Sequence, residues 1–194
     1  MSPSSKLKIN LPALWKSKSS LIGAFQLLAD PIASEHFAHV GYDVVCVDLQ
    51  HGLLSEQHAI ACVRALSAFS ESCVPIIRIS SNDASCVHRA LDGGALGVIA
   101  PMVDTAEEAE LLVYESRYNT ARDGALRNGG RSFGPTRPLT LKVGSSNAPS
   151  GYDVGIEVLE ELNASISTFA MIETKNALDA CEDIIKAGLS LLFV

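Results

Sequence analysis

Short apolar runs alternate with longer amphipathic stretches along the chain. The run Val44-Val45-Cys46-Val47 is continuous and mostly β-branched, which is typical of a strand buried on both faces. Such runs predict six strands, over residues 21–28, 43–48, 74–79, 97–102, 168–173 and 189–194. The stretches between them predict helices over residues 11–18, 31–41, 55–68, 83–92, 105–114, 154–162 and 176–187, with Asn10 and Ser55 as caps of the first and third.

This alternation predicts a parallel sheet with helices outside it. Polar side chains stand at or just beyond the ends of the predicted strands: Gln50, His51, Arg78, Asp104 and Glu173. A (β/α) barrel places its chemistry at that edge, and neither a G-x-G-x-x-G nor a P-loop signature follows the first strand. We therefore predict one domain over residues 1–194, a TIM-type barrel preceded by a polar tail at residues 1–9. A full barrel takes about 250 residues. Because the sequence stops in its sixth strand, we expect a truncated barrel.

The stretch from residue 119 to residue 151 departs from the strand–helix pattern. It is rich in Gly, Pro, Ser and Arg and is longer than an ordinary connection between elements. Such a loop is usually either functional or disordered, so we expect it to influence the choice of substrate.

Composition and charge exclude several classes of protein. Hydrophobic residues make up 47% of the 194 residues and charged residues 19%, which excludes a disordered chain. The net charge of −7 argues against a nucleic-acid surface, and no apolar run reaches the length of about 18 residues that a membrane span needs. The five cysteines are odd in number and lack C-x-x-C spacing, which disfavours a disulfide framework. We expect a soluble, cytoplasmic protein.

Three polar side chains at strand ends form the candidate site. His51 has the side chain whose pKa, about 6.5, suits proton transfer near neutrality. Arg78 lies among isoleucines and needs an anionic partner, and Glu173 at a strand tip needs a cation or a proton. Taken singly, each has an ordinary explanation: a hydrogen-bonded core histidine, a structural ion pair and an acid at a helix start. Their joint placement favours enolate chemistry on a 2-oxo acid.

An ordered series of short motifs covers nearly the whole chain. The motifs are Gly-Ala-Phe at 23–25, Asp-Pro at 30–31 with Glu35, Gly-Tyr-Asp at 41–43, Asp-Leu-Gln-His-Gly at 48–52, Val-Pro-Ile-Ile-Arg at 74–78, Ala-Leu-Asp-Gly-Gly-Ala at 90–95, Pro-Met-Val-Asp-Thr at 101–105, Gly-Arg-Ser-Phe-Gly-Pro at 130–135 and Ile-Glu-Thr at 172–174. In content and order this series resembles the HpcH/HpaI aldolases, which are metal-dependent class II pyruvate aldolases.

The resemblance implies roles for individual residues. His51 matches the catalytic base, and Asp92 matches the aspartate that raises the basicity of that histidine. Arg78 matches the arginine that binds the substrate and stabilises the enolate, and Glu173 matches a carboxylate ligand of a divalent metal, usually Mg²⁺ or Mn²⁺. The implied reaction cleaves a 4-hydroxy-2-oxo acid to pyruvate and an aldehyde. Full-length members of the family are expected to be homo-oligomers.

The sequence departs from the family pattern at two places. Met171 stands where family members commonly have a glutamine that contacts the substrate. The second metal aspartate would follow the sixth strand, beyond Val194, with Asp48 and Asp104 as poor substitutes. We therefore expect the 194 residues not to catalyse the reaction alone and to be poorly stable as a monomer.

Three functional hypotheses follow from these observations. The first is a lyase of this family, and the second is a truncated, non-catalytic relative or incomplete gene product. The third is an enzyme on a similar barrel that binds an acyl-CoA or a phosphonate. The Asp-x-x-His-Gly pattern at 48–52 favours the first over the third.

Overall fold

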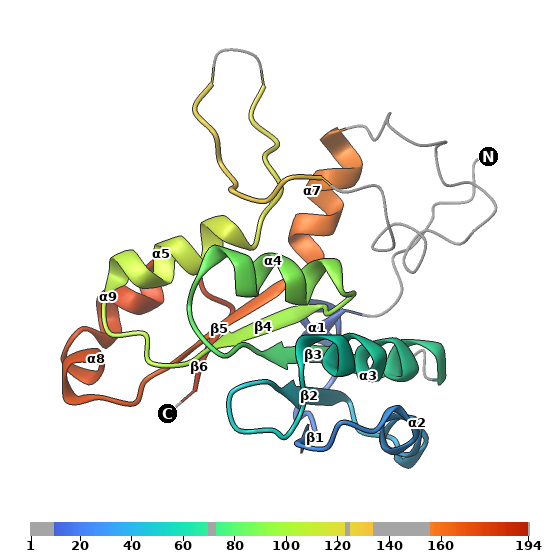
Figure 1. Ribbon diagram of the computed structural model, residues 1–194. Coiled ribbons are helices and arrows are strands. Elements are labelled where there is room, and N and C mark those ends of the chain that lie inside the picture. Colours follow the sequence, from blue (N-terminus) through green and yellow to red (C-terminus); the bar gives the residue numbers. More distant parts are fainter. Residues whose placement is uncertain (1–9, 70–72, 123–124, 134–155, 194) are drawn as a thin grey trace.

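The computed structural model describes residues 10–69, 73–122, 125–133 and 156–193 (Figure 1). The predicted polar tail at residues 1–9 lies outside the described residues. So does most of the predicted long loop, from residue 134 onward.

Within the described residues, six strands form one parallel sheet in which each strand pairs with the next along the chain. They are β1 (Gly23–Gln26), β2 (Val44–Asp48), β3 (Val74–Arg78), β4 (Gly97–Ala100), β5 (Ser167–Met171) and β6 (Leu191–Phe193). Each lies within or next to a run that the hydrophobic pattern singles out, so the predicted parallel α/β architecture is confirmed.

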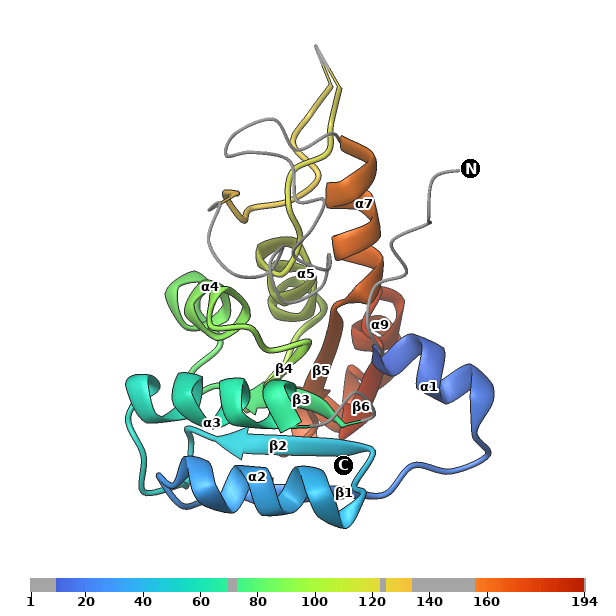
Figure 2. The same cartoon turned by 90° about the vertical axis from the view of Figure 1, so that its right-hand side faces the viewer.

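Helices separate the strands. They are α1 (Leu11–Ser17), α2 (Pro31–Val40), α3 (Glu56–Phe69), α4 (Ala84–Asp92), α5 (Ala106–Glu115), α7 (Ile156–Ser165), α8 (Lys175–Asp179) and α9 (Cys181–Lys186). Figure 2 shows α2, α3 and α4 following one another along one side of the sheet, with α1 on the other. Within the described residues, no helix is both long and apolar enough to cross a membrane.

Polar side chains fix the starts of several helices. Asn10 caps α1 as predicted, because its Oδ1 accepts the N–H of Ala13 at 2.9 Å. Thr105 opens α5 with a capping box, in which Glu108 reaches back to the backbone of Thr105. Ser55 precedes α3, but its hydroxyl lies 3.0 Å from Nδ1 of His58 and is therefore occupied by a neighbouring side chain.

The prediction of one helix over residues 176–187 is wrong. The chain forms α8 and α9 instead, and Ala180 between them has φ −92° and ψ 4°. Ala177 and Ile184, one from each helix, are both fully buried in the same core. No Gly or Pro marks the break in the sequence.

Alternation of side chains along the strands produces two separate cores. Val45, Val47 and Ile77 point toward the surrounding helices and belong to the larger core. Cys46 and Ile76 point to the opposite, inner face, where Leu11 of α1 covers them. A hollow of about 430 Å³ lies on this inner face and is lined mostly by apolar side chains.

Candidate active site

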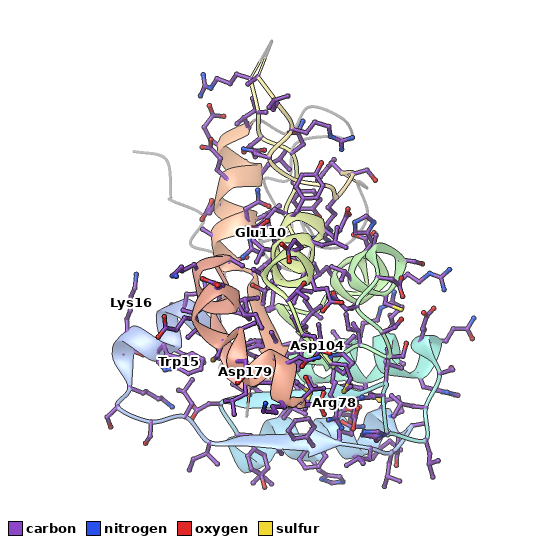
Figure 3. All side chains as sticks on the ribbon, turned by 90° about the vertical axis from the view of Figure 1, so that its left-hand side faces the viewer. Trp15, Lys16, Arg78, Asp104, Glu110 and Asp179 are labelled. Carbon is purple, nitrogen blue, oxygen red and sulfur yellow. The ribbon has the colours of Figure 1, made fainter. Side chains whose placement is uncertain are left out.

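The strand ends bring polar side chains to one edge of the sheet. Asp48 and Arg78 are neighbours in the strand register, and each lies two positions after an inner-face residue, Cys46 or Ile76. A period of two therefore places both side chains on the inner face at the carboxyl ends of their strands. Figure 3 looks onto this edge and shows Arg78 and Asp104 there.

Arg78 and Asp48 form a two-contact ion pair across β2 and β3. Nε of Arg78 donates to Oδ1 of Asp48 at 2.8 Å, and Nη2 donates to Oδ2. The Asp48 side chain is fully buried and that of Arg78 is 13% exposed. The anionic partner that the sequence demands for Arg78 is therefore Asp48.

Asp48 also organises the turn that carries His51. Its Oδ1 accepts the backbone N–H groups of Gln50 at 3.0 Å and His51 at 3.2 Å. Gly52 closes the turn by donating its N–H to the Asp48 carbonyl at 3.1 Å. A Cβ on Gly52 would lie 2.1 Å from that carbonyl oxygen, so glycine is required here. His51 itself is exposed on this turn rather than packed in the sheet interior.

These contacts keep both members of the ion pair charged. Burial is the largest influence on Asp48 and by itself raises the pKa. The hydrogen bonds from Arg78, His51 and Gln50 outweigh it, so the pKa of Asp48 lies below its ordinary value. The hydrogen bond to Asp48 in turn raises the pKa of Arg78, and the negative charge of Glu173 adds to this effect. Glu173 therefore acts electrostatically on the same guanidinium.

A strained backbone position holds Glu173. The N–H of Met102 donates to Oε2 of Glu173 at 2.9 Å. Met102 has φ 52°, in the left-handed region that non-glycine residues rarely adopt, and this conformation occurs directly beyond β4. The backbone of one strand end thus fixes the carboxylate of the next.

Apolar groups complete the surroundings of Arg78. The guanidinium carbon lies 5.2 Å from the ring centre of Phe25, and Nη1 lies 3.8 Å from the sulfur of Met171. Met171 is two positions after Phe169, an inner-face residue of β5. The resemblance-based substrate residues Arg78 and Met171 are therefore in contact.

Comparison with known proteins identifies the family of this chain. The family model described as HpcH/HpaI aldolase/citrate lyase matches residues 21–193. The chain belongs to this family. It is 30% identical over 181 residues to a hydroxypyruvate/pyruvate aldolase of Rhizorhabdus wittichii, covering 93% of this chain and 64% of that protein. It is 32% identical over 174 residues to a 4-hydroxy-2-oxovalerate aldolase of Novosphingobium aromaticivorans, covering 89% and 59%.

Solved structures show the same relationship. An HpcH/HpaI aldolase/citrate lyase family protein from Burkholderia cenocepacia matches with a TM-score of 0.75 at 26% identity, covering 90% of this chain and 63% of that chain. An HpcH/HpaI aldolase from Desulfitobacterium hafniense shares the fold with a TM-score of 0.76 at 22% identity. The chain spans about three fifths of the length of these relatives.

The described residues do not complete a metal site of the kind the HpcH/HpaI resemblance implies. Among them, no group of three or more His, Cys, Asp or Glu side chains lies close enough together to hold an ion. Asp48 is bound by Arg78, and Asp104 accepts the hydroxyl of Thr174 at 2.5 Å. Glu173 likewise accepts the N–H of Met102 with one oxygen, so Glu173 and Asp104 each have one carboxylate oxygen engaged. Two carboxylates are fewer than the several oxygen ligands that a hard divalent ion needs.

Asp92 is not hydrogen-bonded to His51 within this chain. Its Oδ1 accepts Nη2 of Arg131 at 2.7 Å and Nε at 3.2 Å. Arg131 is buried and lies over the ring of Tyr118 at 4.2 Å. Asp92 is the last residue of α4, which runs back from the strand-end edge (Figure 1), so its surroundings differ from those of His51.

Sequence reasoning missed three contributors to the site. Asp48 was considered only as a substitute metal ligand, although a buried Asp and Arg at the ends of consecutive strands are a recognisable signal for an ion pair. The aromatic ring of Phe25 gave no signal beyond its place in a strand. The backbone N–H of Met102 carries no sequence signal, because its position depends on φ.

Proposed function

We propose that this chain carries the site of a carbon–carbon lyase that cleaves a 4-hydroxy-2-oxo acid to pyruvate and an aldehyde. The observation that carries the proposal is the position of the Arg78 guanidinium at the strand-end edge. Buried Asp48 holds it through two hydrogen bonds and, among the described residues, some of its N–H groups remain free to bind a substrate oxygen. The names of the relatives, which are aldolases for hydroxypyruvate, pyruvate and 4-hydroxy-2-oxovalerate, support the same reaction class.

The proposed reaction begins with loss of the proton from the C4 hydroxyl, and His51 is the residue proposed to take it. The C3–C4 bond then breaks, C4 becomes the aldehyde carbon, and the electron pair of that bond forms the enolate of pyruvate. A proton returned to C3 completes pyruvate. His51 suits this exchange because an imidazole both accepts and returns protons near neutrality.

Arg78 stabilises the oxygen on which negative charge develops. Its guanidinium stays charged and is fixed in place, so its remaining N–H groups meet the enolate oxygen without rearrangement. Asp48 is a positioning residue in this scheme, because it holds Arg78 through its side chain and His51 through the backbone.

Glu173 is proposed as one ligand of a divalent ion, with Mg²⁺ or Mn²⁺ as the candidates. Because no group of three or more His, Cys, Asp or Glu side chains gathers among the described residues, Glu173 would need further ligands to hold the ion. We also propose that the role implied for Asp92 depends on a second copy of the chain, which would bring Asp92 to the His51 of its neighbour.

The test is pyruvate release from 4-hydroxy-2-oxovalerate by the purified chain with Mg²⁺ or Mn²⁺. Replacing His51 by Ala should lower turnover by about 10²–10⁴, the usual worth of a general base. His36→Ala is the matched control, because His36 is an exposed histidine on α2 and lies outside the site. Pyruvate release by the wild-type chain would support the proposed function and overturn the expectation that the 194 residues do not catalyse the reaction alone. Absence of release with either ion would contradict the proposed function for this chain and support that expectation. An unchanged rate in His51→Ala would remove His51 from the mechanism.

A further inference from the structure

The unoccupied donors of Arg78 have apolar neighbours. A guanidinium has five N–H groups. Two go to Asp48, from Nε and Nη2, and one from Nη1 points to the Met171 sulfur, so two remain for a ligand. The Phe25 ring lies over the guanidinium at 5.2 Å. A ligand oxygen bound to the remaining donors is therefore flanked by a thioether and an aromatic ring.

The polar side chains next to Arg78 are largely occupied, whereas the buried Oε1 of Gln50, on the His51 turn, has no hydrogen-bond partner among the described residues. Asp48 already accepts four N–H groups, from Gln50, His51 and twice from Arg78. Oδ1 of Asp104 accepts the hydroxyl of Thr174, and the residue next to Arg78 in the β3–β4 register is the apolar Ile99. Glu173 is proposed to bind the metal ion, so we do not expect it to accept this hydroxyl as well.

The side chain that lies next to the remaining donors of Arg78 is Met171. A thioether has no donor and is a weak acceptor, but it is polarisable and packs well against alkyl groups. A hydroxyl placed against it loses its hydrogen bonds to water without gaining a partner, whereas a methyl or methylene group loses nothing. A glutamine, the residue common in the family at this position, would offer both a donor and an acceptor.

We propose that Met171, backed by Phe25, makes this site select pyruvate over hydroxypyruvate as its 2-oxo acid. The inference rests on the proposed function for the class of ligand, and it deepens that function by naming the specificity residue. An apolar pocket rejects an added hydroxyl by at most about 10²-fold. The preference in the wild-type chain should therefore lie between about 10-fold and 10²-fold.

The experiment measures dissociation constants of pyruvate and hydroxypyruvate separately, by ligand-observed NMR titration at one fixed Mg²⁺ concentration. The variants are Met171→Gln, which supplies hydrogen-bonding groups, and Met171→Leu, which keeps an apolar side chain of similar size. The quantity compared between the proteins is the dissociation constant of hydroxypyruvate divided by that of pyruvate. A general loss of stability weakens the binding of both acids alike and leaves this ratio unchanged.

The wild type and Met171→Leu should both bind pyruvate at least about tenfold more tightly than hydroxypyruvate, and Met171→Gln should lower that ratio at least about fivefold. Equal binding of the two acids by the wild type, an unchanged ratio in Met171→Gln, or binding of neither acid would overturn the inference. Selective binding without pyruvate release in the cleavage assay would instead support the inference and contradict the proposed reaction.

Discussion

At the scale of single residues, Asp48 joins the turn of His51 to the side chain of Arg78. Its carboxylate is fully buried and accepts N–H groups from both. Replacing Asp48 by Asn leaves a buried guanidinium without its counter-charge, and such a loss costs about 3–5 kcal/mol. We expect the free energy of unfolding, measured with urea, to fall by that amount. Asp179→Asn is the control, because its pair with Lys175 is exposed and should change stability by less than about 1 kcal/mol.

The Asp48–Arg78 pair also predicts a dependence of stability on pH. The pKa of Asp48 is lower in the folded chain than its unfolded value of about 3.9. Its contribution to stability is therefore fully present above about pH 5 and is lost as the pH falls through the folded-state pKa. Urea unfolding between about pH 5 and pH 3 should show a steeper loss for the wild type than for Asp48→Asn. Parallel curves would mean that Asp48 does not titrate as inferred.

Gly52 provides a second test at this scale. A Cβ there meets the Asp48 carbonyl and the Leu54 side chain at 2.1 and 2.4 Å, so Gly52→Ala must displace the turn and His51 with it. Gly41→Ala is the control, since Gly41 has φ 95° but open space around it, and its cost is about 1–2 kcal/mol of backbone strain alone. We expect turnover to fall with Gly52→Ala and to be retained with Gly41→Ala. Equal turnover in both would contradict the steric argument.

At the scale of elements, the capping box of α5 links helix stability to the edge that holds the site. Thr105 and Glu108 bond each other's backbone, and Glu108 also accepts the N–H of Asp104 at 2.7 Å. Thr105→Ala should lower stability by about 1 kcal/mol. That corresponds to about 2–4 °C in the midpoint of thermal unfolding for a chain of this size. The comparison variant is Asn10→Ala, which removes the cap of α1. A smaller loss of stability in Thr105→Ala than in Asn10→Ala would contradict the link between the capping box and this edge.

Elements were predictable from the sequence where local patterns decide them. The β-branched run at 44–47 and the Asn10 cap both gave elements that the structure confirms. The break at Ala180 was not predictable, because neither Gly nor Pro marks it in the sequence. The side-chain partner of Ser55 also escaped prediction, since His58 competes with the backbone for the same hydroxyl.

At the scale of the whole molecule, the described sheet has two outer strands, β1 and β6. Exposed apolar side chains lie near β1, among them Ile22 at 67% and Leu28 at 61% exposure. An edge of this kind favours pairing with other chains. We expect sedimentation velocity to show self-association that increases with protein concentration. Ile22→Lys should weaken it, whereas Leu178→Lys, at an exposed position of α8, should not. Equal effects of the two variants would place the contact elsewhere.

The candidate site was predictable in part. Strand-end placement and the family resemblance directed attention to His51, Arg78 and Glu173, and the structure links Arg78 to Glu173 electrostatically. The surroundings of Asp92 were not predictable, because its partner Arg131 is distant in sequence and the contact depends on how the chain beyond α5 folds back. The functional roles of all five predicted site residues stay predictions: His51, Arg78, Asp92, Met171 and Glu173.

The Asp48–Arg78 pair makes this a preorganised site. Fixing a flexible side chain during binding costs about 0.5–1.5 kcal/mol. Arg78 is already fixed by β2 before a ligand arrives, and the backbone of the His51 turn is fixed by the same carboxylate. Ligand affinity therefore depends on the ligand's own desolvation and fit. Association should not wait for a rearrangement of this arginine, so its rate should rise linearly with ligand concentration.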